Sequence, residues 1–333
     1  MSLLALVHVA AALVTPLLPG NAITFPDAQH GWAAGSGGIV ATRDGVTWSV
    51  QSHTPVGALA AVDATHAWAL GGEGFVLRTT NGRTWQILGA PHLVRVQFVD
   101  RVHGFGLYRD GVVVRSADAG RSWPQVRTPG TMQTECFAGL HTGWVARGGS
   151  VWTTRDGGTT WARRRLLKDR QGYPLPDLGC RGGDVWVLFH GGVAAGSEGY
   201  VVFRSHDAGR TWRAVLANLD PNFATRVPRI GPGYSGPFSA LGDGRAIFVG
   251  ICGPCGRQPT DTFARTVDGG RMWTRATPFN GVWVDAISFI DSRVGFALTT
   301  SPRGRPRTGL IWETRDGGRR WRRLHASRLV VSG

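Results

Sequence analysis

The sequence predicts an all-β fold, a seven-bladed β-propeller of four-stranded antiparallel blades. Three observations predict it. A short motif with Ser or Thr, then Asp, Gly and Trp occurs seven times along the 333 residues. Each copy follows a stretch that reads as three short strands divided by Gly and Asp turns. The Trp of each copy then opens a fourth strand, and a ring of such blades covers its own strand edges.

The repeated motif is interpreted as a turn that joins the third and fourth strands of each blade. Its copies centre on Asp44, Asn81, Asp118, Asp156, Asp207, Asp268 and Asp316, and the first two copies are one residue shorter than the other five. The Asp carboxylate can accept hydrogen bonds from later backbone N–H groups, and Gly supplies the positive φ of a tight turn. A ring of metal-binding or catalytic carboxylates is the alternative. Since a single site does not need seven dispersed copies, the motif predicts a scaffold, with no metal and no cofactor.

The three strands before each turn are visible in segments such as ITFPDAQHGWAAGSGGIVATRD before the first copy and VQFVDRVHGFGLYRDGVVVRSAD before the third. Apolar and alternating runs separated by Gly and Asp are typical of short antiparallel strands. The propeller is expected over residues 23–324, with a C-terminal tail over 325–333. A monomer is expected.

The chain is basic, with a net charge of +15, and Lys168 is its only lysine. No basic helical stripe or nucleic-acid reader motif is present, so no specific nucleic-acid binding is expected. Many arginines lie within the repeats and read as a solvated surface. Such a surface still attracts acidic proteins or anionic polymers and glycans.

Residues 1–22 contain an apolar run that is short for a membrane span and suits the core of a signal peptide. Export to the cell envelope or medium is therefore expected, with no membrane span. The segment has no Lys or Arg before the apolar run. A wrongly assigned start codon, or an N-terminal strand that closes the last blade, is the alternative; without a signal the chain would be cytoplasmic.

The four cysteines suggest two disulfides. Cys136 and Cys180 fall in the first-strand regions of neighbouring blades, so a bond between them is plausible in an oxidising compartment. Cys252 and Cys255 form a Cys-Gly-Pro-Cys sequence in a loop between strands, where a loop-stapling disulfide is favoured over a metal pair or a redox motif.

The spacing of the seven tryptophans indicates where a binding face would lie. The first three intervals are 37, 38 and 38 residues, whereas the last three are 51, 61 and 48. The additional residues fall in five segments, 167–176, 189–200, 216–236, 252–263 and 300–309. By strand order, all five emerge on the face opposite the Asp turns, from blades 4 to 7. Loops on a rigid scaffold commonly carry function, although long loops are also simply polar and tolerant of insertion.

The polar residues of these segments make up the predicted binding face. Arginine is the most frequent, and a guanidinium suits carboxylate or phosphate groups. The predicted binding residues are Lys168, Arg170, Tyr173, His190, Arg226, Arg229, Tyr234, Arg257, Arg303, Arg305 and Arg307.

The repeat GWAAGSGGIVATRDGVTW, with later copies ending TRDGGTTW and TVDGGRMW, resembles the bacterial-neuraminidase (Asp-box) repeat. In its paired halves and spacing it is most similar to the photosystem II stability/assembly-factor family of seven-bladed propellers and its non-photosynthetic bacterial relatives. The resemblance covers about residues 23–324. It implies a non-enzymatic assembly or binding role that uses an Arg-rich face.

Sialidases share the Asp turn and provide the enzymatic alternative, an exo-glycoside hydrolase. Their Arg-Ile-Pro stretch is missing before the first repeat of this chain. A paired-carboxylate mechanism would have to use loop acids, and the candidates for such a site are Glu198, Asp220, Tyr234 and Asp261, with Asp169 a further acid. The leading hypothesis is an exported, non-catalytic propeller that presents its Arg-rich loops to an acidic protein or polymer.

Overall fold

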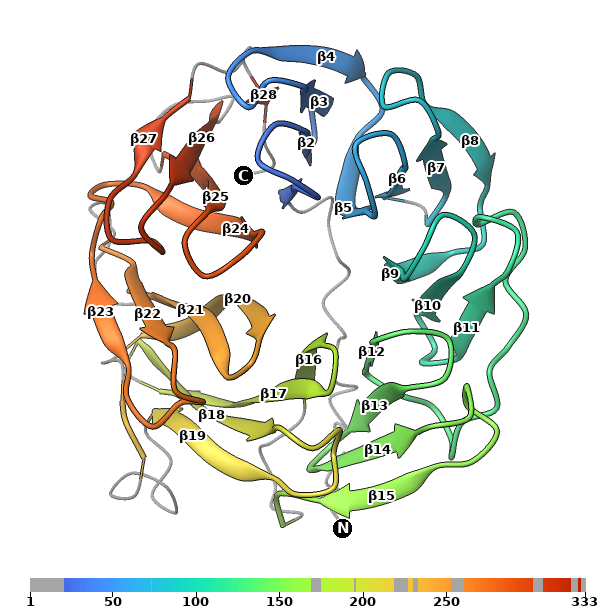
Figure 1. Cartoon of the computed structure of the whole chain (residues 1–333), viewed down its shortest axis with the longest axis vertical. Helices are drawn as coiled ribbons and strands as arrows, with labels where there is room; N and C mark the ends of the chain where they lie inside the picture. Colours follow the sequence, from blue (N-terminus) through green and yellow to red (C-terminus); the bar gives the residue numbers. More distant parts are fainter. Residues whose placement is uncertain are drawn as a thin grey trace, which may run out of the picture.

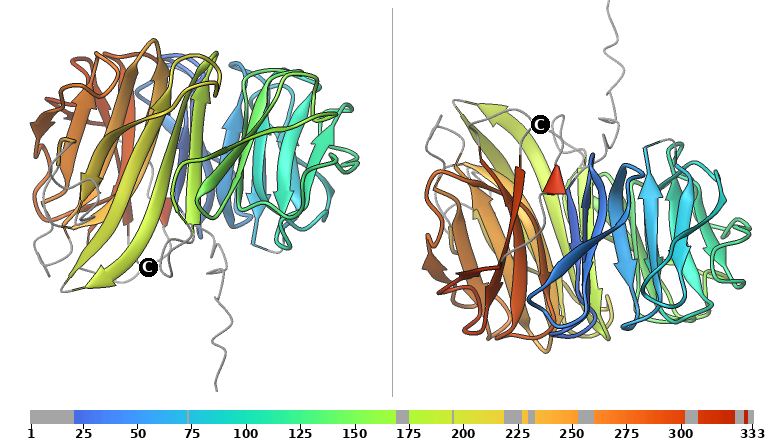
Figure 2. Two further views of the ribbon diagram at one scale, coloured as in Figure 1. Left: turned by 90° about the horizontal axis from the view of Figure 1, so that it is seen from below. Right: turned by 90° about the horizontal axis from the view of Figure 1, so that it is seen from above.

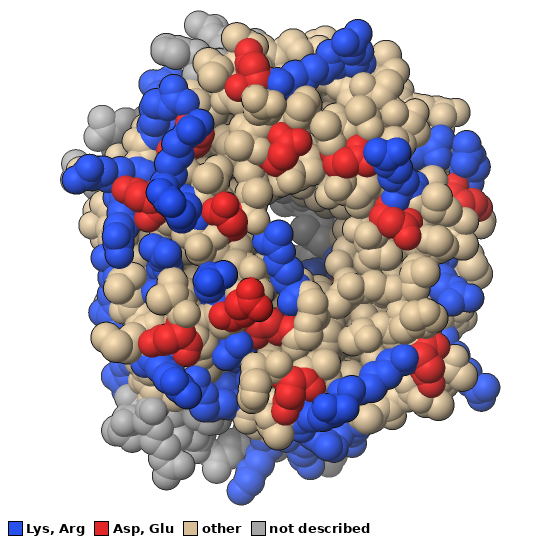
Figure 3. All heavy atoms as spheres, in the orientation of Figure 1, with Lys and Arg blue, Asp and Glu red and all other residues tan. Residues whose placement is uncertain are grey.

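The computed structural model confirms the predicted fold. Seven antiparallel sheets stand in a ring (Figure 1), and the space-filling view shows a channel open at its centre (Figure 3). The structure describes residues 21–72, 74–168, 175–194, 196–218, 227–229, 233–252, 260–301, 308–324 and 329–330. In these ranges all regular elements are strands, and no helix is long and apolar enough to cross a lipid bilayer.

Each blade is built from one continuous stretch of chain, and its first strand lies nearest the channel (Figure 1). The strands of blades 1 to 3 are β1 (Ala22–Thr24), β2 (Gly31–Gly35), β3 (Gly38–Thr42), β4 (Trp48–Ser52), β5 (Val56–Ala61), β6 (Ala67–Gly71), β7 (Val76–Thr79), β8 (Gln86–Gly89), β9 (Leu93–Phe98), β10 (Gly104–Tyr108) and β11 (Val113–Ser116). Those of blades 4 and 5 are β12 (Thr134–Phe137), β13 (Gly143–Arg147), β14 (Ser150–Thr154), β15 (Ala162–Arg165), β16 (Leu175–Arg181), β17 (Asp184–Ala194), β18 (Ser197–Ser205) and β19 (Arg213–Asn218). Those of blades 6 and 7 are β20 (Tyr234–Gly242), β21 (Arg245–Ile251), β22 (Thr262–Thr266), β23 (Thr274–Ala276), β24 (Trp283–Phe289), β25 (Gly295–Thr300), β26 (Thr308–Thr314), β27 (Arg322–Arg323) and β28 (Leu329–Val330).

Two blades depart from the regular four strands at their outer edge. In blade 3 the outer position is reduced to a bridge between Val114 and Gln125, supported by a hydrogen bond from Val126 N to Val113 O of 2.8 Å. In blade 7 both β27 and β28 pair with β26. Both departures leave the first and second strands of the blades in place, so the inner strands still form a closed ring.

The Asp turns differ between the short and long copies. In the short first copy, Asp44 Oδ1 accepts hydrogen bonds from Val46 N at 2.8 Å and Thr47 N at 2.7 Å. In the long third copy, the acceptor Asp118 bonds the residues three and four positions later. The hydrogen bond from the Thr47 hydroxyl, with those backbone donors, holds the pKa of Asp44 well below its usual range. The carboxylates of Asp44 and Asp118 therefore accept hydrogen bonds from their own turns.

The residue directly after the Asp or Asn of each turn adopts a left-handed backbone conformation. Gly fills this position in three of the long copies, but Ala119 and Ala208 occupy it in the other two, with φ of 60° and 56°. Because a Cβ is unfavourable in this conformation, we expect Ala208→Gly to raise the free energy of unfolding by about 0.5–1 kcal/mol. Urea denaturation measures the effect. Ala162→Gly, in exposed strand β15, is the matched control and should instead lower stability; a loss of stability in both variants would contradict the interpretation.

Aromatic stacking joins neighbouring blades. Phe137, from the inner strand β12, stacks on Phe105 of the preceding blade with ring centroids 3.6 Å apart. Phe98 stacks on Trp68 in the same way, at 3.4 Å. The ring closes by a third such pair between blade 1 and blade 7, in which the centroids of Phe25 and Phe296 are 3.4 Å apart. Closure is thus achieved by packing between complete blades.

Glycines make room for these rings. A Cβ built on Gly143, the first residue of β13, would lie 2.2 Å from the ring of Phe137. Gly31 and Gly104 face Phe25 and Phe98 in the same arrangement. The Gly-aromatic pairs at the start of the second strands therefore reflect a close approach that no other residue permits.

Candidate functional site

The strand order separates two faces of the disc. The Asp turns join third to fourth strands, whereas the second-to-third connections and the connections between blades leave from the opposite strand ends. Figure 2 shows the hairpin of β17 and β18 extending beyond the rest of the disc on that opposite side. Figure 3 looks onto the Asp-turn face, where basic and acidic side chains are interspersed around the ring.

Part of the predicted binding face lies outside the described residues. This applies to Arg170, Tyr173, Arg226, Arg257, Arg303, Arg305 and Arg307, and to the candidate acids Asp169 and Asp220. Of the described members, Lys168 and Arg229 are exposed and His190 and Tyr234 are half-buried. Lys168 follows β15 of blade 4. Arg229 follows Pro228, whose carbonyl accepts a hydrogen bond of 3.1 Å from Ala217 N in β19 of blade 5. Lys168 therefore lies at the start of the connection from blade 4 to blade 5, and Arg229 lies in the connection from blade 5 to blade 6.

The structure brings His190 and Glu198 together with Ser235, which the sequence analysis did not single out. His190 lies on β17, Glu198 on β18 and Ser235 on β20 of the next blade. His190 Nδ1 is 2.8 Å from both Glu198 Oε1 and Ser235 Oγ. The other oxygen, Glu198 Oε2, accepts hydrogen bonds from the Ser235 hydroxyl at 2.6 Å and the Ser235 N–H at 2.8 Å. This cluster, of which Glu198 is the buried member, connects blades 5 and 6.

The cluster is not arranged as a catalytic triad. In a triad the serine and the acid contact different nitrogens of the histidine ring, whereas here both face Nδ1. Burial opposes ionisation of Glu198, but the hydrogen bonds from His190 and Ser235 prevail and lower its pKa. A general acid of a glycosidase requires the opposite shift. Glu198 is therefore held as a carboxylate acceptor within the scaffold.

Tyrosine chemistry of the sialidase type is likewise unsupported among the described residues near Glu198. Tyr200 is 1% exposed, and burial together with the nearby Glu198 charge raises the pKa of its hydroxyl. An activated tyrosine nucleophile needs its pKa lowered. Tyr234, the tyrosine named in the hydrolase hypothesis, starts β20 and pairs in register with Ile251.

Asp261 also has a structural role in the described region. Its side chain is fully buried and accepts hydrogen bonds from Val284 N at 2.8 Å and Cys252 N at 3.2 Å. Val284 belongs to β24, so the carboxylate connects blade 6 to the inner strand of blade 7. Burial raises the pKa of Asp261 against these two donors. Both oxygens are thus directed at backbone groups.

The three described cysteines are oxidised in the structure. Cys136 and Cys180 form a disulfide with a Cα–Cα distance of 6.0 Å, which joins the inner strands β12 and β16. Cys252 is also disulfide-bonded, while Cys255 lies outside the described residues. The first bond crosslinks two blades at the wall of the channel.

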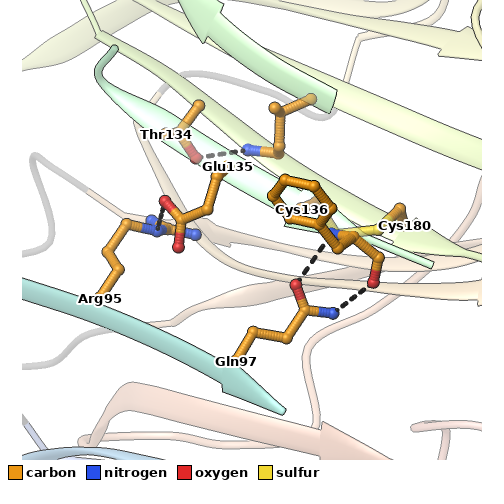
Figure 4. The surroundings of a disulfide bond; sticks show 8 residues. Arg95, Gln97, Thr134, Glu135, Cys136 and Cys180 are labelled. Atoms are coloured by element: carbon orange, nitrogen blue, oxygen red, sulfur yellow. Dashed lines mark hydrogen bonds and ion pairs between the residues drawn. A yellow bond between two sulfur atoms is a disulfide. The ribbon is translucent and has the colours of Figure 1, made fainter. Parts of the chain in front are cut away.

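A charged cluster beside this disulfide was not predicted from the sequence (Figure 4). Arg95 of β9 donates a hydrogen bond of 2.9 Å from Nη1 to Asp177 Oδ1 on β16. Its Nε lies 3.5 Å from Glu135 Oε2 on β12, and Figure 4 shows this second contact. Only 2% of the Glu135 side chain is exposed, compared with 36% for Arg95 and 46% for Asp177. Arg95 and Glu135 line a cavity of about 290 Å³ in the channel wall, together with residues of β20 such as Phe238 and Ser239.

The buried carboxyl of this cluster predicts a pH effect on stability. Burial raises the pKa of Glu135 to about 7, although the Arg95 charge opposes the shift. Because the folded chain holds this proton more tightly than the unfolded chain, stability due to Glu135 decreases as pH rises from about 4.5 to about 7.

We therefore expect Glu135→Gln to be more stable than the wild type at pH 8, by about 1–3 kcal/mol, and the advantage to disappear near pH 4. Urea denaturation at pH 4, 6 and 8 measures it. Asp243→Asn, at a side chain 90% exposed in the β20–β21 turn, is the control and should show no such trend. A Glu135→Gln difference independent of pH would contradict the assignment.

Comparisons with known proteins show similarity in fold only. YCF48 from Cyanidioschyzon merolae, a photosystem II assembly factor, superposes with a TM-score of 0.56 at 18% identity, covering 85% of this chain and 94% of its own. A structure of YCF48 bound to a D1 peptide gives a TM-score of 0.55 at 16% identity, covering 84% and 90%. No protein-family model and no curated protein sequence matches the chain. At these identities the likeness shows a shared propeller architecture.

Proposed function

We propose that the chain is a non-catalytic propeller that binds an acidic segment of a partner protein on the face opposite the Asp turns. The observation that supports the proposal is the strand order of blades 4 to 7. By this order, four long connections leave from the strand ends opposite the Asp turns, and the β17–β18 hairpin, which the sequence suggested as a fifth loop, extends on the same side. The described Lys168 and Arg229 are exposed in two of these connections. Guanidinium and ammonium groups concentrated over one surface attract carboxylates and increase the rate of encounter.

Two further observations favour binding over hydrolysis. The described candidate acids, Glu198 and Asp261, are committed to hydrogen bonds within and between blades. The structural neighbour YCF48 has been solved with a D1 peptide, so a propeller of this architecture accommodates a peptide. An acidic peptide is thus a better-supported ligand than a glycan.

The test compares the removal of four positive charges from each of the two faces. The binding-face variant replaces Arg226, Arg229, Arg303 and Arg305 with Ala. The matched control removes the same charge from the Asp turns by replacing four exposed arginines, Arg121, Arg210, Arg271 and Arg319, with Ala. Fluorescence anisotropy with a labelled ten-residue glutamate peptide measures binding by the full chain.

We expect the binding-face variant to lose affinity at least tenfold and the control to stay within about twofold, since each exposed ion pair contributes about 0.2–1 kcal/mol. Equal losses in both variants would show that net charge alone drives binding and would reject the assigned face. In parallel, Glu198→Gln and the wild type should both fail to hydrolyse fluorogenic sialosides and β-glycosides. Turnover by the wild type that Glu198→Gln abolishes would establish the hydrolase instead.

A further inference from the structure

The Asp turns of blades 6 and 7 depart from a rule that the other five turns follow. In those five, the residue before the Trp is Ser or Thr, and its hydroxyl bonds to the Asp or Asn side chain of the same turn. Thr160, for example, donates to Asp156 Oδ2 at 2.6 Å. Blade 6 has Met272 at this position and blade 7 has Arg320. Two neighbouring turns therefore lack a hydrogen bond that stabilises the other five.

The turn of blade 6 presents apolar side chains to solvent. Met272 is 71% exposed, more than any other large apolar side chain of the described residues. Val267, in the same turn, is 54% exposed. A single exposed apolar residue is common on protein surfaces, but two within one tight turn are unusual, because such turns are mostly built from polar residues and Gly. Exposure of both side chains gives the fold no stabilisation, since burial of apolar surface is the favourable direction.

The turn of blade 7 and the strand β27 that follows it are basic. Between Glu313 and Leu324 the only acids are Glu313 and Asp316. Asp316 accepts hydrogen bonds from the backbone of its own turn. The same segment contains five exposed arginines, Arg315, Arg319, Arg320, Arg322 and Arg323. Positive charge is therefore in excess over this part of the surface.

Two of these arginines are held in place by one buried carboxylate. Glu313 of β26 is 4% exposed. Its Oε1 accepts a hydrogen bond of 2.8 Å from Arg315 Nε, and its Oε2 accepts one of 2.6 Å from Arg322 Nη2. The side chains of Arg315 and Arg322 are 72% and 61% exposed. A guanidinium has five N–H donors, so each arginine is oriented by Glu313 and retains donors for an anionic partner.

The apolar turn and the arginines lie next to each other. Trp321 of blade 7 packs on Phe263 of β22 in blade 6, with ring centroids 5.2 Å apart. A Cβ built on Gly317 would lie 2.9 Å from the guanidinium of Arg265, which directly precedes the blade 6 turn. Burial and the charge of Arg319 lower the pKa of Arg265. Figure 3 shows Lys and Arg side chains crowded over the sector of blades 6 and 7. The two turns therefore form one surface.

We propose that this blade 6–7 surface, made of Val267, Met272 and the five arginines, binds the surface of an anionic lipid bilayer. Arginines near such a bilayer are attracted to its negative charge, and their guanidiniums bond to lipid phosphates. Met272 and Val267 bury apolar area at the boundary between headgroups and acyl chains. A soluble polyanion would use the arginines but offers no apolar layer for Met272, so the combination favours a bilayer. The surface lies on the Asp-turn face, opposite the proposed peptide site, and the proposal does not depend on that site.

Co-sedimentation of the full chain with vesicles measures this binding. We expect the wild type to bind vesicles of phosphatidylglycerol and phosphatidylcholine in equal parts, and to bind less as NaCl is raised, because salt screens the arginine charges. Vesicles of phosphatidylcholine alone should bind at least about tenfold more weakly, since they lack the negative surface charge. A DNA duplex is the probe for a soluble polyanion.

The variants restore the rule of the other turns. Met272→Thr and Arg320→Thr each introduce the hydroxyl that the other blades have, so both should be at least as stable in urea as the wild type. Each should weaken binding to anionic vesicles, and the double variant should weaken it at least about tenfold. The matched control is Arg83→Thr with Ile87→Thr in blade 2, where Arg83 is exposed in the Asp turn and Ile87 is 61% exposed. It removes the same kinds of side chain and should stay within about twofold of the wild type.

Three outcomes would overturn the proposal. The first is equal binding to neutral and anionic vesicles, and the second is a double variant that binds anionic vesicles as the wild type does. The third is binding of the DNA duplex without binding of vesicles, weakened by Arg320→Thr but not by Met272→Thr, which would assign the surface to nucleic acid. Binding of the glutamate peptide should be the same in the double variant and the wild type, so this proposal and the proposed function can fail separately.

Discussion

Phe137→Ala is expected to lower the free energy of unfolding by about 3–5 kcal/mol. The ring is 1% exposed, stacks on Phe105 and covers Gly143 at a distance that leaves no space for another side chain. Its removal leaves a cavity between blades 3 and 4. The strand cannot shift to close that cavity, because Gln97 holds the backbone N–H and C=O of residue 137 in place.

Urea denaturation followed by tryptophan fluorescence measures this loss. Ile87→Ala is the control, because Ile87 is a large apolar residue that is 61% exposed in the outer strand β8, and it should change stability by less than about 0.5 kcal/mol. If the two variants were equally stable, stacking between blades could not be the interaction that holds the ring together.

Loss of the Cys136–Cys180 disulfide is expected to have the second-largest effect. The bond joins residues 44 positions apart, and closing a loop of that length stabilises a fold by roughly 4 kcal/mol when its entropy in the unfolded chain is considered. The double substitution Cys136→Ser and Cys180→Ser should therefore lower the free energy of unfolding by about 2–5 kcal/mol.

The control for this variant is chemical reduction. Dithiothreitol should destabilise the wild type strongly, whereas the double variant should respond less, because it retains only the bond made by Cys252. A double variant as stable as the oxidised wild type would mean that the crosslink contributes nothing to the ring.

The number and class of the blades could be predicted because their signals are local. An Asp turn is formed by an Asp carboxylate, a Gly and a Ser or Thr hydroxyl within eight residues, so all of its parts can be seen in the sequence. The bonds at Asp44 and Asp118 show how one extra residue changes the backbone donors to the carboxylate. They are the second and third following residues in the short turn, and the third and fourth in the long turn. That difference follows from the frame length, which is visible in the sequence.

The cluster in the channel could not be predicted in this way. Arg95, Glu135 and Asp177 are about 40 residues apart from one to the next, and none belongs to a motif. They meet because the inner strands of three successive blades lie side by side in a particular register. Ser235 joined His190 and Glu198 for the same reason, since it comes from the neighbouring blade. The sequence contained one weaker signal for this cluster, since Arg95, Glu135 and Asp177 are charged residues within first strands that are otherwise largely apolar.

The most direct test of the proposed binding face is a footprint of the bound acidic peptide. Hydrogen–deuterium exchange of the full chain, with and without the glutamate peptide, reports which backbone segments are protected. We predict protection in the connections of blades 4 to 7, including the segment around Lys168, the end of the β17–β18 hairpin and the segment around Arg229, with the Asp turns unchanged. Protection of the Asp turns, with those connections unaffected, would contradict the account.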